Sequence, residues 1–290
     1  MNAWPQQHIE EVAEGIVVVL NGAGEMGVSN ACCVIEQQRA LVVDTMTFPY
    51  MADGMIRELE RRAASPDVVL NTHHHIDHMG GNKAFGGARI VAHPTSVQIL
   101  NEIGLPAKLY DTLMPQFRGH FDDLELLLPE PDLEHVTLPR GAELHIFTPA
   151  HTPADITVWF PETRVLLAGD LCFVSVTPLA VHGLLSGWIK ALDALLALDP
   201  LIVVPGHGSI GGKADLIAMR TYLEQVYQLG QQVVAEGLPV PEALAYFNQA
   251  PAADWLESER TALNLQRAIL EVRGEISSSY CPIIPPQARP

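Results

Sequence analysis

Side chains that commonly bind metal ions are concentrated in one six-residue stretch. The stretch contains His73, His75, Asp77 and His78, and two residues separate it from the end of the apolar run at 68–70. Imidazole and carboxylate ligands together suit zinc, and also iron or manganese. Because alternate residues of an extended segment point the same way, His73 and His75 can bind one ion. Asp77 and His78 follow as the chain turns, and they can face a second ion.

Four further segments carry a residue of the same kind. His151, Asp170 and His207 each come shortly after a segment predicted to be a strand, and Asp44 ends another such segment. In layered α/β folds, ligands bind in the crevice at the ends of the strands. We therefore expect these residues to meet the histidine-rich stretch, with Asp44 as its outermost member.

Short β-branched segments and helical patterns alternate along the chain, and they must position these loops. Strands are predicted at 15–20, 31–36, 40–44, 68–70, 88–92, 143–147, 156–160, 165–168 and 201–204. Helices are predicted at 50–64, at 188–198 and over most of 213–275. This order favours an α/β fold with mixed sheets.

Composition excludes several classes of partner. The 290 residues carry a formal charge of −17, which disfavours nucleic acid as a partner. No apolar run approaches the ~20 residues of a membrane helix, and the first residues do not resemble a signal peptide. Cys32, Cys33, Cys172 and Cys281 form no Cys-x-x-Cys pair and are interpreted as reduced thiols. A cytoplasmic protein that acts on a small molecule is expected.

The motifs in order resemble those of the metallo-β-lactamase fold superfamily. His-x-His-x-Asp-His at 73–78 resembles its signature, and Thr148-Pro149-Ala150-His151-Thr152-Pro153 resembles its third-histidine loop. Leu167-Ala168-Gly169-Asp170 resembles its bridging-aspartate segment, and Val204-Pro205-Gly206-His207-Gly208 resembles its last-histidine loop. Leu41-Val42-Val43-Asp44 resembles a strand whose terminal aspartate supports the ligands. The resemblance covers roughly residues 10–230.

The resemblance implies a role for each of these residues. His73, His75 and His151 would bind a first metal ion, Asp77, His78 and His207 a second, and Asp170 would bridge the two. Asp44 would orient a ligand histidine. The implied cofactors are two zinc ions per chain, with iron or manganese as alternatives. The implied fold is a four-layer αββα sandwich at 1–235, followed at 236–290 by a helical appendage and a Pro-rich tail.

Two departures from the family pattern leave every ligand in place. Ala150 stands where a glycine is usual before His151, and Ala154-Asp155 replaces the usual Gly-His or Gly-Ser. Aspartate at 170 is itself informative, since the classical β-lactamases of this superfamily carry Cys or Ser there. The resemblance is therefore to the glyoxalase II and lactonase-like branch.

The expected activity is hydrolysis of a lactone, ester, thioester or amide by a hydroxide that bridges two metal ions. Asp77 is expected to orient that hydroxide and to shuttle its proton. Two alternatives within the same fold stay open. One is an iron-dependent redox enzyme similar to the persulfide dioxygenases, and the other is a hydrolytic dehalogenase that uses the same hydroxide.

The substrate pocket is predicted from residues outside the metal motifs. Tyr110 and Phe117 lie in a long segment before the third-histidine loop, and His182 and Trp188 follow Asp170. Aromatic side chains of this kind can line an apolar pocket, although plain helix packing would give the same pattern. The segment at 264–270 has apolar residues at helical spacing, which predicts packing on its own domain or a homodimer interface.

Overall fold

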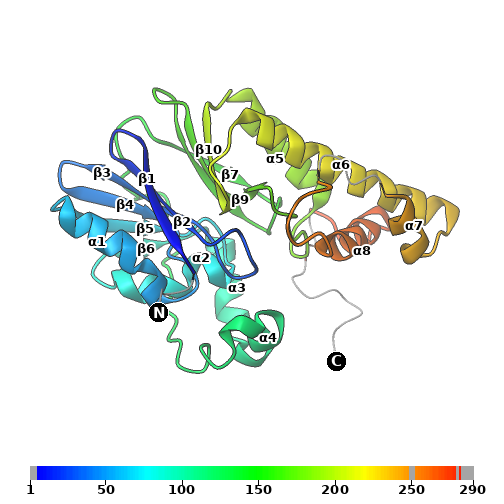
Figure 1. The fold of residues 1–290 in the computed structure, drawn as a ribbon, viewed down its shortest axis with the longest axis horizontal. Helices are drawn as coiled ribbons and strands as arrows, with labels where there is room; N and C mark the ends of the chain where they lie inside the picture. The colour runs from blue at the N-terminus through cyan, green and yellow to red at the C-terminus, as the bar shows by residue number, and fades with distance from the viewer. Residues whose placement is uncertain (1–4, 248–251, 279–280, 282–290) are drawn as a thin grey trace.

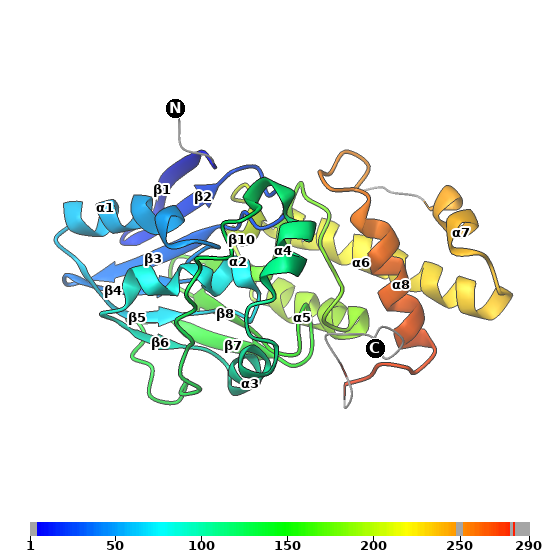
Figure 2. The same ribbon diagram turned by 90° about the horizontal axis from the view of Figure 1, so that it is seen from below.

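Two β-sheets packed face to face form the centre of the molecule, and helices cover the outer side of each (Figures 1 and 2). The computed structural model describes residues 5–247, 252–278 and 281. The order of the layers is helix, sheet, sheet, helix, with further helices after the second sheet. The expected αββα sandwich with C-terminal helices is confirmed.

The first sheet contains six strands in chain order. They are β1 (Gln7–Ala13), β2 (Ile16–Asn21), β3 (Ala31–Glu36), β4 (Arg39–Val43), β5 (Ser65–Leu70) and β6 (Arg89–Val91). Strands β1 to β4 are antiparallel neighbours, whereas β4, β5 and β6 run parallel. The carboxyl ends of β4 and β5 therefore lie side by side, which brings Asp44 next to the histidine-rich stretch.

The second sheet has the order β10-β9-β8-β7. Its strands are β7 (Glu143–Phe147), β8 (Asp155–Phe160), β9 (Val165–Val174) and β10 (Ile202–Gly208). Strands β9 and β10 are parallel, but their register shifts between Val204 and Pro205 and again between Pro205 and His207. Regular ladder pairing is lost at this point, opposite the centre of β9.

Three separate apolar cores hold the layers together. The sheets meet through one core, in which Ile16, Val18 and Leu70 face Val158 and Leu167. Alternate residues of β2 point the other way, so that Val17 and Val19 join a second core. This second core lies on the outer side of the first sheet, beneath the 3₁₀ helix η1 (Pro49–Ala52) and α1 (Asp53–Arg61). Such alternation is the period-two pattern of strands that are buried on both faces.

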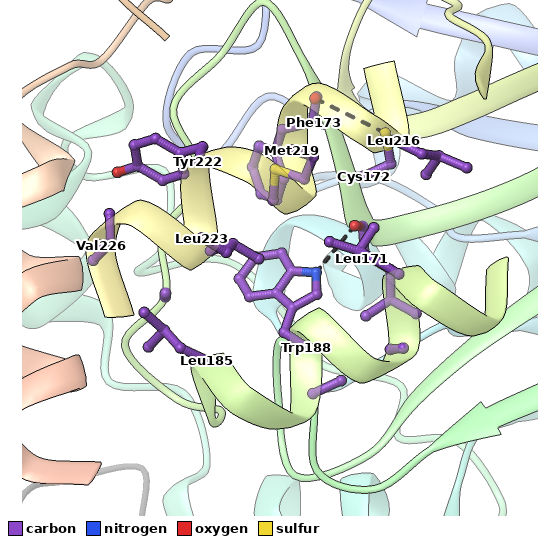
Figure 3. Close-up of a cluster of buried hydrophobic side chains, with 14 of the residues drawn as sticks. Leu171, Cys172, Phe173, Leu185, Trp188, Leu216, Met219, Tyr222, Leu223 and Val226 are labelled. Carbon is purple, nitrogen blue, oxygen red and sulfur yellow. Dashed lines mark hydrogen bonds between the residues drawn. The ribbon is translucent and has the colours of Figure 1, made fainter. Parts of the chain in front are cut away.

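The third core lies on the outer side of the second sheet, under α5 (Leu185–Ala197) and α6 (Lys213–Glu236). Figure 3 shows its centre, where the fully buried Trp188 of α5 packs among side chains of β9 and α6. The indole Nε1–H of Trp188 donates to the carbonyl oxygen of Leu171 at 3.0 Å. Leu171 lies in the stretch of β9 where the ladder register shifts, so the indole provides this carbonyl with a partner.

The C-terminal helices belong to this same core. Helix α8 (Arg260–Val272) buries Leu265 and Ala268 against α6, and α7 (Val240–Tyr246) lies beside it. The contact is close, because a Cβ added to Gly230 of α6 would lie 2.9 Å from the Cβ of Ala268. The apolar face at 264–270 therefore packs on its own chain. Most of the Pro-rich tail lies outside the described residues.

Short helices lie in the connections from β5 to β6 and from β6 to β7. They are α2 (Ile76–Met79), α3 (Pro94–Ile103), α4 (Ala107–Leu113) and the 3₁₀ helices η2 (Gly80–Phe85) and η3 (Pro115–Phe117). Among the described residues, no helix combines the length and apolar character needed to cross a bilayer.

Candidate metal centre

The histidine-rich stretch leaves β5 and enters the single turn of α2. His75 has extended backbone angles, and Asp77 and His78 lie on the helical turn that follows it. The turn lies directly against the loop after β4, because a Cβ at Gly80 or Gly81 would overlap the backbone oxygen of Thr47 or Thr45. Only glycine fits at these two positions, and this close packing fixes where Asp77 and His78 point.

All seven predicted ligand residues come together at the edge between the two sheets. The nitrogen or oxygen atoms of one group lie within 4.8 Å of one another, and this group contains His73, His75, His151 and Asp170. A second group that meets the same criterion contains Asp77, His78 and His207. Asp170 also contacts the second group, since its Oδ1 lies 3.0 Å from His78 Nε2 and its Oδ2 lies 3.5 Å from His207 Nε2.

The distances between these atoms suit a metal pair. Two nitrogens bound tetrahedrally at ~2.0–2.1 Å from zinc lie about 3.3–3.4 Å apart. Here His151 Nε2 lies 3.2 Å from His75 Nδ1 and 3.3 Å from Asp170 Oδ2, and His207 Nε2 lies 3.2 Å from Asp77 Oδ2. The widest of these separations is the 3.8 Å between His73 Nε2 and Asp170 Oδ2.

Several atoms that face this centre have no hydrogen-bond partner among the described residues. They are His73 Nε2, His78 Nε2 and Asp170 Oδ1, and all three are buried; the last two lie 3.0 Å apart but lack the alignment of a hydrogen bond. A buried polar atom without a partner is costly, and such atoms are rare in folded proteins unless they bind something. The donor set, its spacing and its unpartnered atoms therefore fit a pair of metal ions.

The opposite nitrogens of three histidines are held by the protein. His78 Nδ1 lies 2.7 Å from Asp44 Oδ2, His207 Nδ1 lies 3.0 Å from the Val28 oxygen, and His73 Nδ1 lies 2.9 Å from Thr72 Oγ1. Asp44 also accepts hydrogen bonds from the backbone N–H and the hydroxyl of Thr72, at 2.7 and 2.8 Å. Asp44 thus lies behind the cluster and contacts His78.

Charges inside the cluster shift the pKa values of its members in opposite directions. Burial alone would raise the pKa of the Asp170 carboxyl, but the neighbouring His78 and His207 hold it well below its usual range. Burial would lower the pKa of His207, yet Asp170 and Asp77 raise it to about 9. For His73, burial has the largest effect on the pKa and lowers it. These opposite shifts reflect the close contact between the Asp170 carboxylate and the imidazole rings around it.

Asp170 and His207 correct one expectation, because they lie within β9 and β10 and not just past the strand ends. Strand β9 continues to Val174 through an irregular stretch. Gly169 has a φ of +51°, and a Cβ at Gly206 would overlap the Asp170 carboxylate. These two glycines let the strands bend and approach each other closely, so that a residue inside a strand can face the centre.

Asp155, one of the departures from the family pattern, supports the loop that carries His151. Its carboxylate accepts hydrogen bonds from the backbone N–H and the hydroxyl of Thr152, at 2.8 and 2.9 Å. Burial raises the pKa of Asp155 to about 6. The side chain thus closes the turn after His151.

A cavity of about 110 Å³ opens onto the cluster. Of the predicted pocket residues, Tyr110 and His182 line it, together with His75, Asp77 and His151. Phe117 and Trp188 are not among the lining residues. Phe117 packs edge-on against Phe48, with ring centroids 5.1 Å apart, and Trp188 packs edge-on against His151, with ring centroids 4.7 Å apart.

Sequence reasoning missed one charged residue of this cavity. Arg260, at the start of α8, is only 3% exposed and lines the cavity wall. Its Nη1 donates to the Thr177 oxygen at 3.0 Å, and its Nε has no hydrogen-bond partner among the described residues. No local motif marks Arg260, since only the packing of α8 brings it to the site.

Comparison with known proteins identifies the family. The family model described as "Metallo-beta-lactamase superfamily" matches residues 26–207, which include all seven clustered residues. The chain belongs to the metallo-β-lactamase superfamily. Among solved structures, the DIM-1 metallo-β-lactamase superposes with a TM-score of 0.60 at 21% identity and covers 76% of this chain and 98% of that chain. At this identity, the similarity to that β-lactamase is one of fold.

Curated proteins also match part of the chain. A hydroxyacylglutathione hydrolase of Synechococcus sp. is 26% identical over 170 residues, which are 57% of this chain and 57% of that protein. A "Beta-lactamase-like protein 2 homolog" of Drosophila melanogaster is 28% identical over 153 residues, 52% of this chain and 48% of that protein. This superfamily member thus spans about half the length of the curated relatives it matches.

Proposed function

We propose that this superfamily member is a metal-dependent hydrolase that holds two zinc ions and cleaves a small carbonyl compound. The observation that carries the proposal is the convergence of seven ligand-type side chains, of which His73, His78 and Asp170 each have a buried inward-facing atom without a hydrogen-bond partner among the described residues. His73, His75 and His151 would hold one ion, and Asp77, His78 and His207 the other. Asp170 contacts both groups and would bridge them.

Bound metal ions supply two things at such a site, a nucleophilic hydroxide at neutral pH and polarisation of the substrate carbonyl. The protein provides the rest. Asp77 lines the cavity, and its Oδ2 is held 3.2 Å from His207 Nε2. A carboxylate in this position can orient a water molecule and take up its proton. Asp44 and Thr72 fix the histidine rings from behind, so that the donor atoms need little rearrangement.

The cavity supports a substrate whose reacting part is small and mostly apolar. A volume of about 110 Å³ is well below the ~300–1,000 Å³ of pockets that enclose a drug-sized ligand. Met26, Tyr110, Leu113 and Phe173 provide its apolar walls. The hydroxyacylglutathione hydrolases among the relatives make a thioester the first substrate to test, followed by lactones, esters and amides.

Metal analysis and a substrate panel test the proposal together. The purified protein is expected to contain about two zinc ions per chain and to hydrolyse at least one thioester, lactone, ester or amide. Asp77→Asn keeps the size of the side chain and removes its basicity, so kcat, measured at saturating zinc, should fall by a factor of about 10²–10⁴. One iron per chain would favour the redox alternative, and release of halide from halogenated aromatics would favour the dehalogenase.

A further inference from the structure

One histidine of the cluster is held on both sides of its ring. Nδ1 of His75 faces the centre, 3.2 Å from Nε2 of His151. Nε2 of the same ring lies 2.7 Å from Nδ1 of His182, which belongs to the loop between β9 and α5. Both histidines are partly buried and line the cavity. The outer side of a candidate ligand is therefore in contact with a second imidazole.

Two interpretations of this contact are possible, a third metal position or a hydrogen bond. His74, His75 and His182 do form a further group whose ligand atoms lie within 4.8 Å of one another. Two nitrogens on one zinc ion should lie about 3.3–3.4 Å apart. The 2.7 Å between His75 and His182 is too short for a shared ion and lies in the range of a hydrogen bond.

The direction of that hydrogen bond follows from the proposed metal site, on which this inference rests. If Nδ1 of His75 offers its lone pair to a metal, the ring proton must be on Nε2. His75 Nε2–H then donates, and Nδ1 of His182 accepts. We propose that His182 is a positioning residue, which fixes the tautomer and the ring orientation of His75 for metal binding.

The loop of His182 is itself tied down on two sides. Leu184 N–H donates to the oxygen of Ala150 at 3.0 Å, which joins the loop to the residue before His151. From the other side, Nε of Arg267 in α8 donates to the oxygen of Gly183 at 2.8 Å. Gly183 allows no side chain, since a Cβ there would overlap the oxygen of Ala150. His182 is thus anchored between the His151 loop and the C-terminal helices.

The other orienting contacts make the assignment specific. Asp44 and the Val28 oxygen accept from the ligand-type histidines of the second group, whereas Nδ1 of His151 has no hydrogen-bond partner among the described residues. Removal of the His182 imidazole should therefore weaken binding of the ion held by His75 and leave the affinity for the other ion unchanged. Outer partners of this kind typically change metal affinity 10–100-fold.

The test measures metal binding directly. Metal-stripped wild type, His182→Leu and His182→Asn are titrated with Co²⁺ by visible absorption, and their zinc affinities are measured against a competing chelator. His182→Leu is expected to bind one of two ions 10–100-fold more weakly, with a changed Co²⁺ spectrum. His182→Asn offers an amide oxygen as acceptor and should recover most of the affinity. Val181→Ala, the neighbouring residue of the loop, is the matched control and should bind both ions as wild type does.

Three results would overturn the inference. Wild-type affinity for both ions in a folded His182→Leu variant would show that the contact does not support His75. A third zinc ion in the wild type that disappears in His182→Leu would make His182 a ligand. A wild type that binds no metal would overturn the proposed function as well as this inference. The first two results, in contrast, would overturn only the inference about His182. Thermal unfolding of each metal-free variant checks that the fold persists.

Discussion

Replacement of Trp188 by phenylalanine distinguishes a residue of the core from a residue of the substrate pocket. Trp188 is fully buried in the core outside the second sheet, and its Nε1–H donates to the Leu171 oxygen at 3.0 Å (Figure 3). Leu171 has no ladder partner on β10, because the register between the strands skips past it. Phenylalanine would fill most of the space but would leave this carbonyl without its donor.

The expected loss can be estimated from two effects. A buried carbonyl left without a partner costs about 1–3 kcal/mol. The smaller ring leaves a void of roughly 40 Å³, which adds about 1 kcal/mol at ~24 cal/mol per Å³. Trp188→Phe should therefore lower the free energy of unfolding by about 2–4 kcal/mol. KM, once a substrate is known, should change little, because Trp188 does not line the cavity.

Urea denaturation of the metal-free protein measures this loss. Trp159→Phe is the matched control, because Trp159 is also buried but its indole forms no hydrogen bond among the described residues. It should cost less than Trp188→Phe by the value of the missing hydrogen bond. Stability within ~0.5 kcal/mol of wild type together with a strongly raised KM would refute this reasoning, and would favour the pocket role that the sequence suggested.

Three further changes test other parts of the structure. Asp44→Asn should weaken zinc binding about 10–100-fold in a chelator competition, because it alters the acceptor behind a ligand-type histidine. Gly81→Ala should destabilise the fold by more than about 2 kcal/mol in urea, since its Cβ would overlap the Thr45 oxygen. Hydrogen bonds from Arg61 and Arg62 lower the pKa of Glu58 from 4.5 to about 2. Ionised Glu58 therefore stabilises the fold above pH 4.5, and this contribution disappears as the pH falls towards 2. Glu58→Gln should cost about 1 kcal/mol at pH 7, after allowance for the solvent exposure of the pair, and less at pH 3.

Most strands could be predicted from the sequence because their side chains are buried on both faces. The run Val68-Val69-Leu70 is one example, and β3 has the bounds that its pattern predicted. Strand β1 was missed for the opposite reason. Its residues are largely polar and exposed, and it forms only because the apolar β2 offers an edge to pair with. A pattern of buried residues cannot reveal an edge strand of this kind.

Some residues of the candidate site could likewise be predicted from the sequence, and others could not. His73, His75, Asp77 and His78 could be found because four ligand-type residues lie close together in sequence. The contributions of Arg260 and of the contact between His75 and His182 could not be found, since each depends on the docking of distant segments. Trp188 was predicted to line the pocket but lies in the core. An aromatic residue near a motif has the same sequence pattern in either place.

The contacts of Asp44 have an entropic consequence for metal uptake. Asp44, Thr72 and His78 are already joined by hydrogen bonds at 2.7–2.8 Å in the protein chain alone. The conformational freedom of these side chains is therefore lost during folding and not when an ion arrives. A chain built in this way should remain folded without metal, unlike a zinc finger, and should bind its ions with a small change in heat capacity.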